Sequence, residues 1–180
     1  MSNRIHRKRV IPVLLLNKGG LVKSKRFKDY TYVGDPINAV RIFNDKEVDE
    51  IVILDIDASK EKRGPNFEMI SEITGEAFMP LAYGGGITSL DQAEKLFYNG
   101  VEKVILNTIL GQENGLQLIS DISKRYGNQS VIVSIDFKES LFKKKKVYAH
   151  ASNKTMNVDI LTFAKQCEEV GCGEIMLNAV

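Results

Sequence analysis

Short apolar runs recur along the chain, separated by segments in which apolar residues follow a helical spacing. The runs are rich in Val and Ile and are near-continuously apolar rather than alternating. They cover Val10–Leu16, Glu50–Asp55, Met79–Tyr83, Lys103–Asn107, Ser130–Asp136 and Glu174–Asn178. Runs of this kind are typical of strands buried on both faces, as in parallel sheets. The pattern therefore predicts six strands.

The segments between the runs carry apolar residues three or four positions apart, which predicts amphipathic helices. The five spacings begin at Ile37, Met69, Ala93, Leu116 and Val158. The order of elements is therefore strand, helix, strand, helix throughout.

Local signals mark where some of these helices begin and end. Asp35 stands before Pro36 as a plausible N-cap, and Ser89 with Gln92 forms a predicted capping box. Gly100 provides the stop for the third helix.

An alternating α/β chain of this kind fits either an open doubly wound sheet or a TIM-type (β/α)8 barrel. Chemically interesting residues follow almost every strand instead of one switch point, which favours the barrel. A complete barrel usually needs about 250 residues. We therefore expect residues 1–180 to form a single partial (β/α) barrel domain, truncated after the sixth strand and with two open sheet edges.

The composition limits the classes of partner. Hydrophobic residues make up 43% and charged residues 27% of the chain, and the net charge is only +2, so neither nucleic acid nor a membrane is the expected partner. Cys167 and Cys172 give neither a disulfide framework nor a metal set, and His6 and His150 are isolated. No run approaches the ~20 apolar residues that cross a bilayer. We expect a cytoplasmic protein without a metal or cofactor.

The most specific local signal is a glycine-rich turn followed by a polar pair. Tyr83-Gly84-Gly85-Gly86 comes after the third predicted strand, and Asn107-Thr108 comes after the fourth. Glycine lets backbone N–H groups approach phosphate oxygens, and Asn and Thr add donors. The alternative is a tight turn that only needs positive φ. The matching Asn-Thr pair favours a phosphate site.

Acidic residues also follow two strands, where a barrel gathers its catalytic groups. Asp55 and Asp57 follow the second strand, and Asp136 follows the fifth. Each is either an acid/base group or a helix N-cap. The run Lys143–Lys146 is interpreted as a solvated loop in a hairpin turn, with anion steering as the alternative.

These features resemble a known family, the cyclase (HisF) subunit of imidazole glycerol phosphate synthase. The resemblance runs in order through Arg9-Val10-Ile11, Gly19-Gly20-Leu21-Val22-Lys23, Gly34-Asp35-Pro36, Leu54-Asp55-Ile56-Asp57-Ala58-Ser59, Tyr83-Gly84-Gly85-Gly86-Ile87, Lys103–Thr108 and Val133-Ser134-Ile135-Asp136. It implies a lyase or amidotransferase synthase subunit that forms a heterodimer with a HisH-type glutaminase. Such a subunit inserts the glutaminase's ammonia into a phosphorylated substrate.

The resemblance also implies roles for individual residues. Arg9, Glu50, Lys103 and Glu174 match the family's ammonia gate on the lower face of the barrel, the alternative being ordinary surface charges. On the upper face, Asp136 matches a catalytic carboxylate. The substrate and phosphate positions match Lys23, Asp55, Gly85, Gly86, Asn107 and Thr108.

One position departs from the family. Leu15 stands where the family has its other catalytic Asp, and leucine cannot transfer a proton. This combination looks like the divergent relatives found with surface-polysaccharide genes, which are thought to deliver ammonia for the amidation of a sugar. We therefore favour sugar amidation. The alternatives are cyclisation of the ribulosyl aminoimidazole carboxamide intermediate in histidine biosynthesis, and a non-catalytic fragment that only binds a glutaminase.

Overall fold

A computed structural model describes residues 8–25, 28–107, 114–139, 145–149 and 154–179. Six of the described strands run parallel to one another, in the order in which they occur along the chain. They are β1 (Val13–Asn17), β4 (Ile51–Asp55), β5 (Leu81–Gly84), β6 (Lys103–Leu106), β7 (Val131–Glu139) and β10 (Glu174–Ala179). These six strands overlap the six apolar runs, so the predicted parallel α/β sheet is confirmed.

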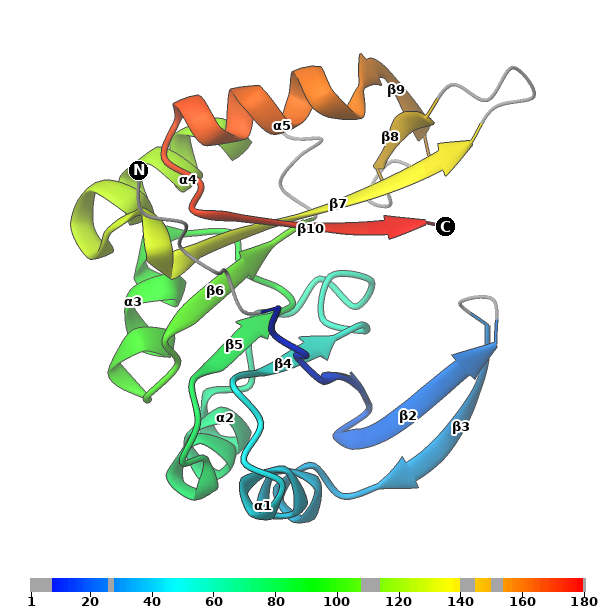
Figure 1. Ribbon diagram of the computed structural model, residues 1–180, viewed down its shortest axis with the longest axis vertical. Helices are drawn as coiled ribbons and strands as arrows, with labels where there is room; N and C mark the ends of the chain where they lie inside the picture. Colours follow the sequence, from blue (N-terminus) through cyan, green and yellow to red (C-terminus); the bar gives the residue numbers. More distant parts are fainter. Residues whose placement is uncertain (1–7, 26–27, 108–113, 140–144, 150–153, 180) are drawn as a thin grey trace.

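Five α-helices connect the parallel strands and lie along one side of the sheet in an arc (Figure 1). Their bounds are α1 (Pro36–Asp45), α2 (Phe67–Glu76), α3 (Leu90–Tyr98), α4 (Gly115–Tyr126) and α5 (Ile160–Glu169), and a short 3₁₀ turn, η2, covers Asn128–Ser130. In the described ranges, no helix is long and apolar enough to cross a membrane.

Four further described strands run antiparallel. They are β2 (Gly20–Lys25), β3 (Lys28–Gly34), β8 (Lys145–Ala149) and β9 (Lys154–Asp159). The pairing of β7 with β8 agrees with the hairpin turn expected at the lysine run, but Lys145 and Lys146 belong to β8 rather than to the loop, and the other three strands were not predicted. The sheet continues from the last three residues of β1 into β2 and β3, so on this side its open edge lies at β3 as well as at the start of β1. Val158 belongs to β9 rather than to a helix, because Asp159 caps α5 immediately after it.

The predicted helix signals are largely confirmed. The Asp35 side chain accepts a hydrogen bond from Asn38 N at 3.0 Å, and Ser89 Oγ accepts one from Gln92 N at 3.3 Å. The Gln92 side chain reaches back one residue further than a capping box requires, because its Oε1 accepts from Thr88 N. Gly100 follows α3 with a φ of 91°, as a helix stop requires.

Side chains on the two faces of the sheet form separate apolar layers. The larger layer packs between the sheet and the helices and includes Ile53, Leu96 and Ile119. The smaller layer lies on the opposite face, which we call the inner face, and is built around Val52, Ala82, Ile105 and Ile132. These four residues lie on neighbouring strands, and their shared direction follows from the alternation of side chains along each strand.

The glycine-rich turn after β5 is shaped by backbone packing. Gly85 and Gly86 have φ values of 132° and 70°, a region that favours glycine. A Cβ on Gly85 would lie 2.6 Å from the carbonyl oxygen of Asp55, and one on Gly86 would collide with the carbonyl oxygen of Arg63. The turn can therefore hold the loop after β4 only if both residues lack a side chain.

We predict that Gly86→Ala lowers the free energy of unfolding by about 1–3 kcal/mol, because it adds both steric overlap and backbone strain. The matched control is Gly75→Ala in α2, where a Cβ meets nothing within 4 Å. That change should raise stability by roughly 0.5–1 kcal/mol through helix propensity. Urea unfolding followed by circular dichroism measures both. Equal stability of the Gly86 variant and the unmodified protein would contradict the packing argument.

Candidate functional site

Four charged side chains meet at the N-terminal ends of the parallel strands. Lys103 Nζ lies 2.8 Å from Glu50 Oε2 and 2.7 Å from Glu174 Oε1. The Arg9 guanidinium closes the arrangement, with one nitrogen 3.0 Å from Glu50 Oε2 and another 3.6 Å from Glu174 Oε1. Each cation therefore contacts both anions. We call these four residues the charge ring.

The ionised states within the charge ring support one another. Burial opposes the charged form of Lys103, but its hydrogen bonds to Glu174 and Glu50 outweigh this and raise the pKa of Lys103. Burial likewise opposes the Glu174 carboxylate, yet the Lys103 hydrogen bond and the nearby charges lower the pKa of Glu174. The pairing between Lys103 and Glu174 therefore favours the charged form of both groups.

Glu50 is the most enclosed member of the charge ring. Its side chain is 2% exposed, and Glu50 directly precedes Ile51, the first residue of β4. Glu50 Oε2 accepts from both cations, whereas no described residue donates to the buried Oε1. Immediately above Glu50 on the inner face lies the apolar layer built around Val52. A polar layer at the strand starts is therefore followed directly by an apolar one.

A second polar cluster lies on the inner face at the C-terminal ends of β6, β7 and β10. Asp136 is 7% exposed, and an asparagine amide donates to each of its carboxylate oxygens. Asn107 Nδ2 lies 2.9 Å from Asp136 Oδ2, and Asn178 Nδ2 lies 3.0 Å from Asp136 Oδ1. Ser134 accepts the other bond of each amide, through its carbonyl oxygen from Asn107 and through Oγ from Asn178.

Asp55 and Asp57, which follow β4, hold loops in place. Arg63 donates two hydrogen bonds to the Asp55 carboxylate, at 2.8 and 2.9 Å, and the backbone N–H groups of Asp57 and Ala58 add two more. The side-chain hydrogen bond to Asp55 is the main cause that raises the pKa of Arg63. Asp57 accepts from Asn17 Nδ2 and from Lys18 N, which fixes the turn after β1.

The predicted phosphate residues are only partly described. Gly85 and Gly86 lie at the C-terminal end of β5, next to the end of β6 that carries Asn107. The Asn107 amide directs its donors to Asp136 and Ser134, so its role toward a phosphate stays a prediction. Thr108 lies outside the described residues, as do His6, His150 and the lysines at 143 and 144.

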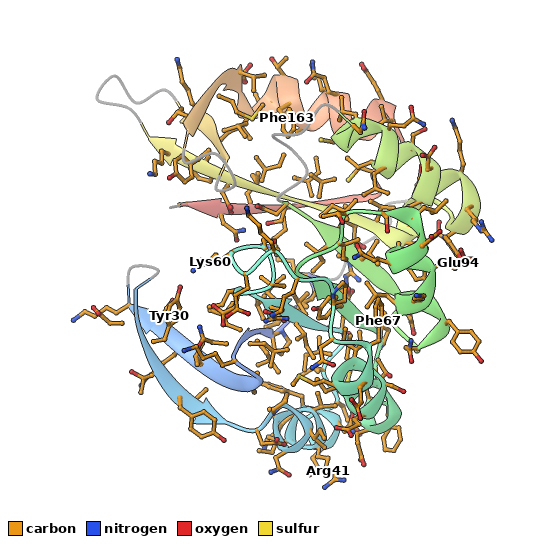
Figure 2. The ribbon with its side chains drawn as sticks, turned by 180° about the vertical axis from the view of Figure 1, so that it is seen from behind. Tyr30, Arg41, Lys60, Phe67, Glu94 and Phe163 are labelled. Carbon is orange, nitrogen blue, oxygen red and sulfur yellow. The ribbon has the colours of Figure 1, made fainter. Side chains whose placement is uncertain are left out.

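The β2–β3 hairpin stands beside the same end of the sheet and carries Lys23, which is exposed. Lys60, from the loop after β4, places its Nζ 5.6 Å from the centroid of the Tyr30 ring, which joins this loop to the hairpin (Figure 2). A shallow cavity of about 480 Å³ opens at the base of the hairpin; it is lined by Asn17, Lys18, Gly19, Gly20, Val22, Tyr30, Tyr32 and Asp35. Sequence patterns gave no sign of it.

Leu15 lies near the end of β1 and pairs in register with Leu54 of β4. Its neighbours Leu14 and Leu16 pack into the helix-side layer, so alternation places Leu15 on the inner face. Within the described ranges, no group of three or more His, Cys, Asp or Glu side chains is arranged to hold a metal ion. Cys167 and Cys172 are free and buried.

Sequence reasoning missed two residues of these clusters, Arg63 and Asn178. The signal for Asn178 was present, because it ends an apolar run just as Asn107 and Asp136 do. Strand ends of a parallel sheet meet at one edge, so the three polar residues were bound to converge. Arg63 carried no such signal, because it lies in a loop whose path the strand pattern does not determine.

Residues 9–180 match the protein family described as "Histidine biosynthesis protein". The chain is 50% identical over 174 residues to "Putative imidazole glycerol phosphate synthase subunit hisF2" of Pseudomonas aeruginosa, which covers 97% of this chain and 68% of that relative. It is 46% identical over 175 residues to a relative of similar description from Leptospira borgpetersenii, with the same coverage. It is 36% identical over 173 residues to "Imidazole glycerol phosphate synthase subunit HisF" of Chlorobium limicola, covering 96% of this chain and 68% of that one.

The family match spans nearly the whole chain, and the aligned relatives cover the strands that carry the charge ring and Asp136. The resemblance stated from the sequence motifs is thereby confirmed. The chain belongs to the histidine biosynthesis protein family and, within it, to the HisF-type subunits of imidazole glycerol phosphate synthase.

Proposed function

We propose that this protein is the synthase subunit of a glutamine amidotransferase, which receives ammonia from a HisH-type glutaminase bound as a heterodimer in the cytoplasm. The observation that carries the proposal is the charge ring. Two cations and two anions converge from separate strand starts and pair with one another, with Glu50 almost fully enclosed. Scattered surface charges would not be expected to meet in this way.

The layers above the charge ring support passage of a small neutral molecule. The apolar layer offers no charged partner that would stabilise an ion. Leaving water for this layer costs neutral ammonia much less free energy than it costs an ion. At the far end of the strands, Asp136 is the candidate acid/base group. Ammonia entering at the charge ring would therefore reach a carboxylate that can accept and donate protons during the reaction.

The favoured reaction is amidation of a surface-polysaccharide sugar, and Leu15 is the reason. A leucine on the inner face, in register with Leu54, leaves Asp136 without the second acid/base residue expected from the family resemblance. Loss of one member of such a pair costs on the order of 10²–10⁴ in rate. The sequence identities agree with divergence from the HisF subunits. They are 44–50% with the relatives described as "Putative imidazole glycerol phosphate synthase subunit". They are 36–37% with the HisF subunits of Chlorobium and Pelodictyon.

Two other functions remain as candidates. Cyclisation of the ribulosyl aminoimidazole carboxamide intermediate is supported by Asp136 and by the glycine turn, for which we propose a phosphate-binding role. Glutaminase binding without turnover is supported only by the charge ring. The three functions can therefore be distinguished by which phosphorylated substrate the protein turns over, if any, and by whether it binds a glutaminase.

We predict that removing the positive charge of Lys103 uncouples glutamine hydrolysis from amination. Lys103→Met keeps the length of the side chain but removes the more buried of the two cations shared by Glu50 and Glu174, which leaves Arg9 alone to pair with both. Product formed from glutamine should fall about 10-fold or more, equivalent to about 1.4 kcal/mol, while the glutaminase still hydrolyses glutamine. The matched control, Lys165→Met on the exposed surface of α5, should behave like the unmodified protein. Unchanged coupling in the Lys103 variant would refute the gate.

We predict that Leu15→Asp moves activity toward cyclisation of the histidine-pathway intermediate. The new carboxylate would stand on the inner face beside Leu54, and it would supply the second acid/base residue expected from the family resemblance. Turnover of the ribulosyl aminoimidazole carboxamide, supplied with ammonium salt, measures the change. The control is Leu15→Asn, whose side chain has the shape of Asp but no carboxylate. This variant should not gain cyclisation activity. Efficient cyclisation by the unmodified protein would show that the choice of sugar amidation is wrong.

A further inference from the structure

The Asp136 carboxylate is fixed from both sides by amide donors that come from different strands. Asn107 approaches Oδ2 from the end of β6, and Asn178 approaches Oδ1 from the end of β10. Asp136 and Asn178 are paired in register on neighbouring strands, so the contact follows directly from sheet geometry. The side chain is also nearly enclosed, with 7% of its surface exposed.

Each asparagine amide uses both of its hydrogens within this cluster. The second hydrogen of Asn107 goes to the Ser134 carbonyl oxygen, and that of Asn178 goes to Ser134 Oγ. An NH₂ group has only two hydrogens to donate. In this arrangement the two amides therefore orient the carboxylate and have no hydrogen left for a ligand.

We propose that Asn178 is a positioning residue, which holds the Asp136 carboxylate in the orientation needed to accept a proton from a bound substrate. The proposal rests on the amidotransferase function proposed above. With both amides committed to Asp136 and Ser134, the cluster presents acceptor oxygens to the interior. Such oxygens suit the N–H or O–H groups of an amine or a polyol, which donate to a carboxylate.

Asn178 is suited to this task because it lies on β10, whereas Asp136 lies on the neighbouring strand β7. A carboxylate on a strand end can rotate about its side-chain bonds, and one donor alone would leave that rotation partly free. Donors on two flanking strands, at 2.9 and 3.0 Å, fix the orientation of both oxygens. Two hydrogen bonds to a charged acceptor are strong enough to hold one rotamer against the others.

The first test needs no substrate. In ¹⁵N-labelled protein, the side-chain amide protons of Asn178 should exchange slowly with solvent, and Asp136→Ala should make them exchange faster. Asn99 is the matched control, because its side-chain amide donates to Lys95 O, in α3, and does not contact Asp136. Asn178 protons that do not respond to Asp136→Ala would overturn the proposal.

The second test separates positioning from a merely structural role. Asn178→Leu keeps the size of the side chain and removes its donors, so kcat for glutamine-dependent amination should fall about 10-fold or more while KM changes little. Asn178→Ser, which keeps one hydroxyl donor, should recover part of kcat. Leu177→Ala, on the same strand and facing away from Asp136, should leave both constants unchanged.

The two tests fail in different ways. Equal kcat values for Asn178→Leu and the unmodified protein would overturn the positioning role while leaving the amidotransferase function intact. If the unmodified protein aminates no substrate from glutamine or from ammonium chloride, the proposed function fails. The amide-exchange measurement then still decides whether Asn178 holds Asp136.

Discussion

The in-register pairing of the parallel strands is the constraint on which the rest of this structure depends. Successive side chains of a strand point to opposite faces, so a fixed register makes neighbouring strands present residues of equal height together. Val52 is paired with Ala82 and Ile105 with Ile132 in this way, and Asp136 is paired with Asn178. A slip of one residue would turn these side chains to the helix side. The charged layer, the apolar layer and the carboxylate cluster are therefore three levels of one arrangement.

The electrostatics of the two polar levels follow from how each is enclosed. At the strand starts, Glu50 is buried with a cation on either side, and removal of one partner would leave a buried charge poorly compensated. At the strand ends, Asp136 is held by neutral amides instead. These donors fix the orientation of both carboxylate oxygens. The lower level is thus held together by pairing of opposite charges, and the upper level by hydrogen bonds from neutral amides.

The sequence predicted the parallel strands because buried strands must be apolar on both faces, and that demand leaves a direct trace. It did not predict β2, β3 and β9, and it indicated β8 only through the hairpin turn at the lysine run, because hairpin strands with one exposed face contain too many polar residues to stand out. The convergence of the charge ring was foreseen through the family resemblance. The pairing of Arg63 with Asp55 was not, because a bond across a loop depends on backbone turns that glycines such as Gly86 permit.

Asn178 illustrates the same limit at the candidate site. Its position at a strand end was visible in the sequence, but only the register places its amide 3.0 Å from Asp136. Leu15 illustrates the opposite case. The substitution was visible in the sequence, and its interpretation is unchanged because the inner face of β1 is where an acid/base group would be needed. Residues on strands were therefore easier to interpret than residues in loops.

The most direct measurement of the central claim follows the nitrogen atom itself. The protein and its glutaminase would be given glutamine labelled with ¹⁵N in the amide, a phosphorylated acceptor sugar or the ribulosyl aminoimidazole carboxamide, and an excess of unlabelled ammonium chloride. If ammonia enters at the charge ring and travels through the inner face to Asp136, mass spectrometry will find the product labelled with ¹⁵N despite the excess. A product whose nitrogen comes from the unlabelled pool would show that ammonia reaches the site through solvent, which would contradict the account.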